Sequence, residues 1–478
     1  MMGLMASDET RTETRTETRT GTRTRTRTGT SEATPPGKST AHEAQAPGTR
    51  AWTTWTTRLL LLGIVLAAFN LRPAITSLGA LLEEVRDGLG MSGSVAGLLT
   101  SVPPLCFAVF GVTAPRLARR FGPGAVVCAG MVAITAGLLV RPYAGGTAGF
   151  LAATALALMG IAVSNVLMPV IVKRYFPDRV GSMTGLYSMA LAFGTSIAAA
   201  ATVPVTNALG GHWQPGLAVW AVVGAAAVLP WIPFVRDRKA PSTTSPARDS
   251  SDGDGDGDGV DGTTAEPATA RADRSAEPSA EQPPLRITRS RTAWALAVFF
   301  GLQATAAYIT MGWMAQIFRD AGVSAGTAGL LLAVIMVMGV PLAFVIPRVA
   351  TRLPHQGPIV LVLGVCGLAG YAGLYFAPAG GAWAWALLLG VSNCAFPLAL
   401  TMVGMRARTG AGVAQLSAFA QSTGYLISIP GPLLVGVLYQ HSGGWGLPIA
   451  LMSALMVPQI VVGFLAGRDR TVEEEAAR

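Results

Sequence analysis

Twelve long apolar stretches constrain the fold of this 478-residue chain more than any other feature. A helix needs about 20 apolar residues to cross a bilayer, and its backbone polar groups must be bonded within the segment. We therefore expect an all-α integral membrane protein with twelve transmembrane helices. The predicted spans are 59–82, 94–114, 123–141, 147–172, 181–208, 216–235, 292–318, 324–347, 357–377, 380–403, 412–439 and 444–466.

The composition excludes several other classes of protein. Hydrophobic residues make up 51% of the chain and charged residues only 13%, which is not the composition of a soluble enzyme. The net charge of +9 does not indicate nucleic-acid binding, because the basic residues form short clusters between apolar spans. The expected partners are the lipid bilayer and a small solute. No catalytic constellation appears, so we do not expect an enzyme.

No metal or cofactor is expected either. The four cysteines lie inside apolar stretches without metal-binding spacing. A run of alternating Asp and Gly starts at Asp252 and resembles a calcium loop. An EF-hand loop needs Glu at its twelfth position, where this chain has Thr263. This segment is interpreted as an acidic linker.

Composition also divides the chain into five parts. Residues 1–57 form a low-complexity basic tail that cannot bury a core, so we expect it to be disordered and cytoplasmic. A first six-helix bundle covers 58–235 and a second covers 292–467. The segment between them, 236–291, is rich in Pro, Ser, Asp and Gly and is predicted to be a disordered linker. Residues 468–478 form a short cytoplasmic tail.

Basic residues in the short loops predict the topology, because loops rich in Lys and Arg stay in the cytoplasm. Ten basic residues lie in the short loops on one side of the predicted membrane, and three lie on the other. The basic side carries Arg116, Arg119, Arg120, Lys173, Arg174, Arg179, Arg348, Arg352, Arg406 and Arg408. We therefore expect a multi-pass plasma-membrane protein with both termini and the linker in the cytoplasm.

The two halves of the chain repeat one another at an offset of about 230 residues. The segment PRLARR from Pro115 matches PRVATR from Pro347, and SNVLMP from Ser164 matches SNCAFP from Ser392. The matches follow the same order in both halves. Two six-helix halves joined by a cytoplasmic linker indicate a parallel repeat about an axis along the membrane normal.

This arrangement resembles the major facilitator superfamily. The segments AFNLRPAITSLG, from Ala68, and NVLMPVIVKRYFPDRVGSMTGLYSMAL, from Asn165, look like its cyanate permease and nitroimidazole transporter branch. The resemblance implies that spans 1, 4, 7 and 10 are central, that spans 2, 5, 8 and 11 form gates, and that the substrate is a small polar or anionic solute.

The loop after the second span differs from the pattern of that superfamily. In GVTAPRLARRFG, Pro115 stands where the family has an aspartate, while Arg116 and Arg120 keep the cationic part. We predict a gating role for both arginines and for Arg348 in the equivalent loop of the second half. They could meet helix C-termini, whose carbonyls are partially negative, or only set the topology.

Arg72 is the most informative single residue. It lies about 20 Å from the start of the first predicted span, at 1.5 Å per residue, which is too deep for its side chain to reach a headgroup comfortably. Arginine stays protonated, so a negative or strongly dipolar group should meet it. We predict that Arg72 binds substrate near the middle of the membrane. The alternatives are that it bonds loose carbonyls or pairs with Glu84.

Three prolines accompany candidate polar side chains. Pro73 follows Arg72 and Asn70 and is expected to kink the first span. Pro169 and Pro397 each stand four residues after an asparagine, Asn165 and Asn393. Each asparagine could support the loosened backbone or contact the substrate directly, and each proline is a candidate hinge.

Further candidates are scarce polar residues in apolar surroundings. They are Tyr187 on the fifth span, Gln303 and Tyr308 on the seventh, and Gln421 and Tyr425 on the eleventh. Each could face a cavity or a neighbouring helix. Only Glu83 and Glu84, at the outer end of the first span, offer titratable carboxylates near a predicted path, so the coupling ion stays open.

The leading hypothesis is secondary active or facilitative transport of a small anionic or polar organic solute, cyanate-like or carboxylate-bearing, by alternating access. The alternatives are efflux of a nitroimidazole-like or other drug-sized compound and a non-transporting membrane receptor. A monomer is the default expectation.

Overall fold

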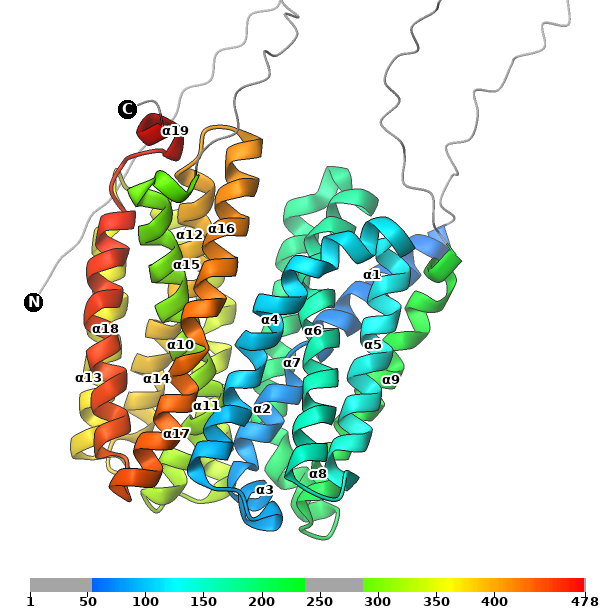
Figure 1. The fold of residues 1–478 in the computed structure, drawn as a ribbon, viewed down its shortest axis with the longest axis vertical. Coiled ribbons are helices and arrows are strands. Elements are labelled where there is room, and N and C mark those ends of the chain that lie inside the picture. The colour runs from blue at the N-terminus through cyan, green and yellow to red at the C-terminus, as the bar shows by residue number, and fades with distance from the viewer. Residues whose placement is uncertain (1–53, 237–286, 477–478) are drawn as a thin grey trace, which may run out of the picture. The chain divides into compact units, whose positions relative to one another are not determined.

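The computed structural model describes residues 54–236 and 287–476, which form helices joined by short turns (Figure 1). Twelve helical spans among them, of 20 to 32 residues, are long and apolar enough to cross a membrane. Each predicted span overlaps one of these twelve. The prediction of an all-α protein with twelve transmembrane helices is therefore confirmed.

The predicted tail 1–57 and linker 236–291 lie mostly outside the described residues. Residues 54–57 belong to the first helix, which therefore starts four residues before the predicted boundary at 58. Residues 287–289 form a short 3-10 turn. The predicted C-terminal tail contains a short helix, 472–476, that the sequence did not indicate.

Helices α1 to α9 form the first bundle. They are α1 (Thr54–Asn70), α2 (Pro73–Ala80), α3 (Leu82–Leu89), α4 (Gly93–Phe121), α5 (Pro123–Val140), α6 (Thr147–Tyr175), α7 (Val180–Ala208), α8 (Trp213–Ala218) and α9 (Trp220–Val228), with 3-10 turns η1 (Arg141–Tyr143), η2 (Pro177–Arg179) and η3 (Leu229–Arg236).

Helices α10 to α19 form the second bundle and its C-terminal extension. After η4 (Ile287–Arg289) come α10 (Arg291–Asp320), α11 (Ala325–Val337), α12 (Gly339–Ala350), α13 (Gly357–Phe376), α14 (Ala382–Asn393), α15 (Ala395–Met405), α16 (Gly410–Ser428), α17 (Pro430–Ser442), α18 (Gly446–Ala466) and α19 (Val472–Ala476).

The first span is broken in its middle. α1 ends at Asn70 and α2 begins at Pro73, so a two-residue turn interrupts the helix inside the apolar stretch. Pro73 has no N–H to offer the carbonyl of Phe69. That carbonyl faces Gly194 of α7, where any side chain would collide with it. The break at Pro73 therefore lies where α1 packs closely against α7.

The other two predicted hinges behave differently from one another. α14 ends at Asn393, so the span breaks ahead of Pro397. Pro169 lies within α6, which continues as one helix from Thr147 to Tyr175. The two Asn–Pro pairs match in sequence, but only the second one lies at a break in its helix.

Contacts between the bundles concentrate at one end of the molecule, which we call the closed end. Hydrogen bonds and ion pairs join the two bundles there and within two turns of it, and a hydrogen bond between the Arg72 and Tyr308 side chains joins them farther along. Ser94 donates to Gln440 Oε1 from its backbone N at 2.8 Å and from its hydroxyl at 2.7 Å. Deeper in, Trp313 Nε1 donates to Thr100 Oγ1 at 3.1 Å.

Glycines allow the backbones at the closed end to touch. A Cβ on Gly97 of α4 would lie 2.8 Å from the carbonyl oxygen of Leu433 on α17, and one on Gly93 would lie 2.9 Å from that of Gly436. Small residues permit such close approach between helices in a membrane. The opposite end, where Arg236 and Ile287 flank the undescribed segment, is called the linker end. The helix ends of the two bundles stand apart there (Figure 1).

Candidate functional site

Arg72 lies in the break of the first span. It is the residue before α2, with φ −123° and ψ −25°, and Pro73 occupies the first turn of that helix. The side chain is half-buried. Its guanidinium forms no ion pair with any described residue, and no described carbonyl accepts a hydrogen bond from it. Glu84, the alternative partner, pairs with Arg319 instead.

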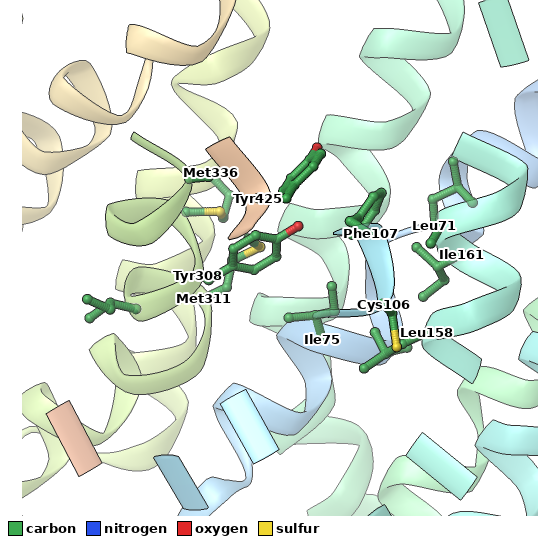
Figure 2. Close-up of a cluster of buried hydrophobic side chains, with 14 of the residues drawn as sticks. Leu71, Ile75, Cys106, Phe107, Leu158, Ile161, Tyr308, Met311, Met336 and Tyr425 are labelled. Atoms are coloured by element: carbon green, nitrogen blue, oxygen red, sulfur yellow. The ribbon is translucent and has the colours of Figure 1, made fainter. Parts of the chain in front are cut away.

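Three aromatic side chains from three helices surround the Arg72 guanidinium. Its Cζ lies 6.0 Å from the centre of the Phe107 ring. Phe107 stacks on Tyr425 with ring centres 5.0 Å apart and lies 6.5 Å from Tyr308. Both tyrosines interact electrostatically with the guanidinium. Figure 2 shows Phe107, Tyr308 and Tyr425 gathered from α4, α10 and α16.

A cavity adjoins this cluster on the side toward the closed end. The cavity is small in this conformation, with a volume of about 10 Å³. Its walls are mostly apolar and include Tyr308. The lining residues are Ala74, Ile75, Leu78, Gly79, Leu99, Thr100, Pro103, Thr154, Leu158, Tyr308 and Gly312. The hydroxyl of Thr154 is buried and has no partner among the described residues, so it could donate to or accept from a solute.

The sequence predicted two of these aromatic residues and missed the third. Tyr308 and Tyr425 were singled out as rare polar groups in apolar spans, and the structure brings both to Arg72. Phe107 carries no polar atom and looks like any other apolar residue of its span. Only the neighbouring Pro103–Pro104 pair marked that part of the helix as unusual.

Arg141 was also missed, because it stands at the edge of an apolar stretch in the sequence. It is the first residue of η1 and only 1% exposed. Its Nη1 donates to the Ala74 carbonyl at 2.8 Å and its Nη2 to Ser77 Oγ at 3.2 Å. A second guanidinium therefore lies against α2, the helix that Arg72 precedes.

Asn70 does not share the surroundings of Arg72. It is fully buried, and its Nδ2 lies beside Gly224 of α9, on the side of the first span away from Phe107. Neither amide atom has a hydrogen-bond partner among the described residues. Asn165 is half-buried on α6. The prediction that these two asparagines bind substrate remains untested.

Gln303 and Asn393 contact each other rather than the cavity. Gln303 Nε2 donates to the Asn393 carbonyl at 2.9 Å, and Gln459 Nε2 donates to Gln303 Oε1 at 3.1 Å. The Asn393 carbonyl is the one that loses its helical donor to Pro397. Gln303 thus supplies the missing hydrogen bond, which favours the helix-packing alternative for both residues.

The two remaining polar candidates make local contacts. Gln421 Nε2 donates to Ser417 Oγ on its own helix at 2.7 Å. Tyr187 on α7 is partly buried and packs against the hydrophobic core. Neither lies among the residues that line the cavity.

The predicted gating arginines lie on the surface. Arg116 and Arg120 at the end of α4 are exposed, and Arg120 stacks on its neighbour Phe121. Arg348 on α12 is exposed and donates to the Phe344 carbonyl of its own helix at 3.0 Å. Among the described residues, none of the three reaches the opposite bundle, so a gating role for them stays a prediction.

Comparison with known proteins agrees with this architecture. The model of the Major Facilitator Superfamily matches residues 59–413. The 2-nitroimidazole transporter of Escherichia coli is 30% identical over 420 residues, which cover 87% of this chain and 96% of that protein. The cyanate transport protein CynX of Escherichia coli is 28% identical over 404 residues, covering 84% and 96%. The inward open structure of the xylose transporter XylE from E. coli superposes with a TM-score of 0.64 at 10% identity, over 87% of this chain and 98% of that one.

Proposed function

Because this chain belongs to the Major Facilitator Superfamily and is a multi-pass membrane transporter, we propose that its substrate is a small anionic organic solute that binds at Arg72. The observation that carries this proposal is a guanidinium in the middle of an apolar span that has no counter-charge among residues 54–236 and 287–476. An anion from solution would supply that charge, and the arginine fork can hold a carboxylate or similar planar anion with two hydrogen bonds.

The surroundings of Arg72 favour a flat solute. Phe107 and Tyr425 form a pair of stacked aromatic rings, and Tyr308 adds a hydroxyl group and lines the cavity. Cyanate-like and carboxylate-bearing compounds fit this combination of one cation with aromatic walls. The similarity to a cyanate transport protein supports the same class.

Alternating access would carry the solute past this site. In the described conformation the bundles meet at the closed end, so the site would communicate with the linker end. We expect the linker end to face the cytoplasm, because the short loops on that side carry the excess of basic residues. Opening the closed end while the linker end closes would expose Arg72 to the other side.

Uptake measurements on Arg72 variants test the proposal. In proteoliposomes, Arg72→Gln should reduce saturable uptake of the transported anion at least a hundredfold, because a charge-assisted bidentate contact is lost. Arg72→Lys should retain part of the activity. Equal uptake by wild type and Arg72→Gln would show that the anion binds elsewhere. A thermal-shift screen with cyanate, nitrate and benzoate would identify the first ligand.

Efflux of a nitroimidazole-like compound is the second candidate function. It is favoured by the mostly apolar cavity and by the similarity to a 2-nitroimidazole transporter. Cells with and without the gene would separate the two functions. Resistance to 2-nitroimidazole that depends on the gene, without uptake of anions, would support efflux.

A further inference from the structure

Arg141 is a fully buried cation, and no carboxylate of the described part of the chain lies beside it. Two of its terminal nitrogens donate to neutral oxygens of α2, and its Nε has no hydrogen-bond partner in the described chain. None of the ion pairs found in residues 54–236 and 287–476 includes it. These two hydrogen bonds use two of its five N–H donors, and they do not balance its charge.

Other well-buried arginines of this protein do have a carboxylate partner. Arg406 is equally buried at 1% exposure and pairs with Asp469 at 3.4 Å. Arg319 pairs with two glutamates. Arg141 shares its lack of a counter-charge with Arg72. An arginine cannot become neutral to relieve such burial, so its field persists.

Both unbalanced cations lie on the same short helix. Arg72 precedes α2, and Arg141 holds Ala74 and Ser77 in the middle of it. Ala74 also lines the cavity. Arg141 is therefore separated from the cavity by little more than the backbone it binds. Water and salt screen the field of a buried charge only weakly. The Arg141 charge can therefore act on a solute at the other side of a helix.

We propose that Arg141 is a second, non-contacting cation of the anion site. It positions α2 behind the cavity and raises the affinity for anions over neutral solutes of the same shape. This inference rests on the proposed function, because it concerns the selectivity of the same site. Arg72 holds the anion directly, and Arg141 adds a positive potential from behind the cavity wall.

The test compares an anion with its neutral isostere on the purified full-length chain. Benzoate and benzamide have nearly the same shape and differ in charge. In Arg141→Gln, benzoate should bind on the order of tenfold more weakly, as expected for one charge removed about 10 Å away in a partly polar interior. Benzamide binding should change less than about twofold, since no contact to the solute is lost. Calorimetric titration measures both.

A second variant neutralises the same charge and leaves Arg141 itself in the chain. Ser77→Asp places a carboxylate next to the guanidinium and should lower the preference for benzoate as Arg141→Gln does. Ser77→Asn is the matched control, since it has nearly the same size but no charge, and it should keep the wild-type preference. If only one of Arg141→Gln and Ser77→Asp can be purified, the change of benzoate preference in that variant is sufficient to test the role of Arg141.

The outcomes separate this inference from the proposed function. A wild-type protein that binds benzoate no better than benzamide contradicts the anion site itself. A wild-type preference for benzoate that survives in Arg141→Gln or Ser77→Asp overturns only the role of Arg141. Equal weakening of both ligands would reduce Arg141 to an anchor for α2 and also overturns the proposal.

Discussion

Arg319 of α10 bridges to Glu84 of α3 with 2.8 Å between Nη1 and Oε2, and so ties the second bundle to the first at the closed end. Its other terminal nitrogen reaches Glu83 at the same distance. Both glutamates belong to the outer extension of the broken first span. The pair must separate whenever the closed end opens, so it favours the described conformation.

Removing the Arg319 charge should shift the balance between conformations. Each partly exposed ion pair is worth up to about 1 kcal/mol, which is a factor of up to about five. Arg319→Gln should therefore raise the population in which the closed end has opened by up to about fivefold for each of the two pairs. Spin labels at the exposed residues Asp87 and His441, one in each bundle, report this distance. The charge swap Arg319→Glu with Glu84→Arg should restore part of the closed population.

Arg408→Gln is the matched control for that experiment. Arg408 also pairs with a glutamate, Glu474, but both residues belong to the second bundle and its extension. Its loss should leave the label distances unchanged. An Arg319→Gln protein with wild-type distances would mean that the other closed-end contacts, such as Ser94 with Gln440 and the glycine packing, are sufficient to hold the bundles together.

Bulk at Gly436 should block the described conformation. A Cβ there would overlap the Gly93 carbonyl on α4. Overpacking of this kind costs about 1–3 kcal/mol, and it is avoided if the bundles separate at the closed end. We expect Gly436→Val to reach the membrane but to transport at least tenfold more slowly. Gly404→Val is the control, because nothing lies within 4 Å of a Cβ at Gly404. Similar rates for both variants would contradict tight packing at Gly436.

Gln303 should matter more for stability than for substrate binding. Gln303→Leu leaves the Asn393 carbonyl and the Gln459 amide unsatisfied, and each buried unsatisfied group costs about 1–3 kcal/mol. The melting temperature of the purified protein should fall by several degrees. Gln421→Leu, which loses a single contact within its own helix, should lower it much less. If Gln303→Leu instead keeps its melting temperature and loses substrate affinity, Gln303 contacts the substrate.

The short C-terminal helix should detach at low pH. Glu475 accepts hydrogen bonds from Ser290 Oγ at 2.6 Å and from Thr292 N at 3.1 Å, and so caps the start of α10. Burial by itself raises the pKa of Glu475, but the hydrogen bonds from Ser290 and Thr292 outweigh it and hold the pKa below the ordinary 4.5. The folded form therefore prefers the carboxylate.

The direction of the pH effect follows from that lowered pKa. The stabilisation by Glu475 is fully present above pH 4.5 and is lost as the pH falls through the lower pKa of the docked form. The protection of 472–476 against hydrogen exchange, measured relative to the intrinsic exchange rate at each pH, should fall in that range. Glu475→Gln should show fast exchange already at neutral pH. Protection that is independent of pH would exclude Glu475 as the anchor.

Much of the fold could be predicted because the bilayer acts as a uniform solvent. A span has to be apolar along its whole length, so the twelve helices are legible in the sequence without knowing their neighbours. The same reasoning located Arg72, since a charge inside such a span stands out. It also located Pro73, whose missing N–H removes one hydrogen bond from the helix at the break between α1 and α2.

The candidate site was less predictable, because the direction in which a side chain points depends on the helices packed around it. Tyr308 and Gln303 lie on one helix and looked alike as isolated polar residues. The structure turns Tyr308 toward Arg72 and Gln303 toward Asn393. The Asn–Pro motifs at Pro169 and Pro397 could not be told apart from the sequence either. In the structure, the helix breaks before Pro397 but continues through Pro169.

The sequence alone thus determined the number and type of helices and the presence of a deep cation, because the cost of polar groups in lipid acts residue by residue. Only the tertiary structure decided that Phe107 covers Arg72, that Arg141 lies buried behind α2, and that Glu84 pairs with Arg319. Each of these relationships joins residues far apart in the chain. They depend on how rigid helices pack, which no local pattern encodes.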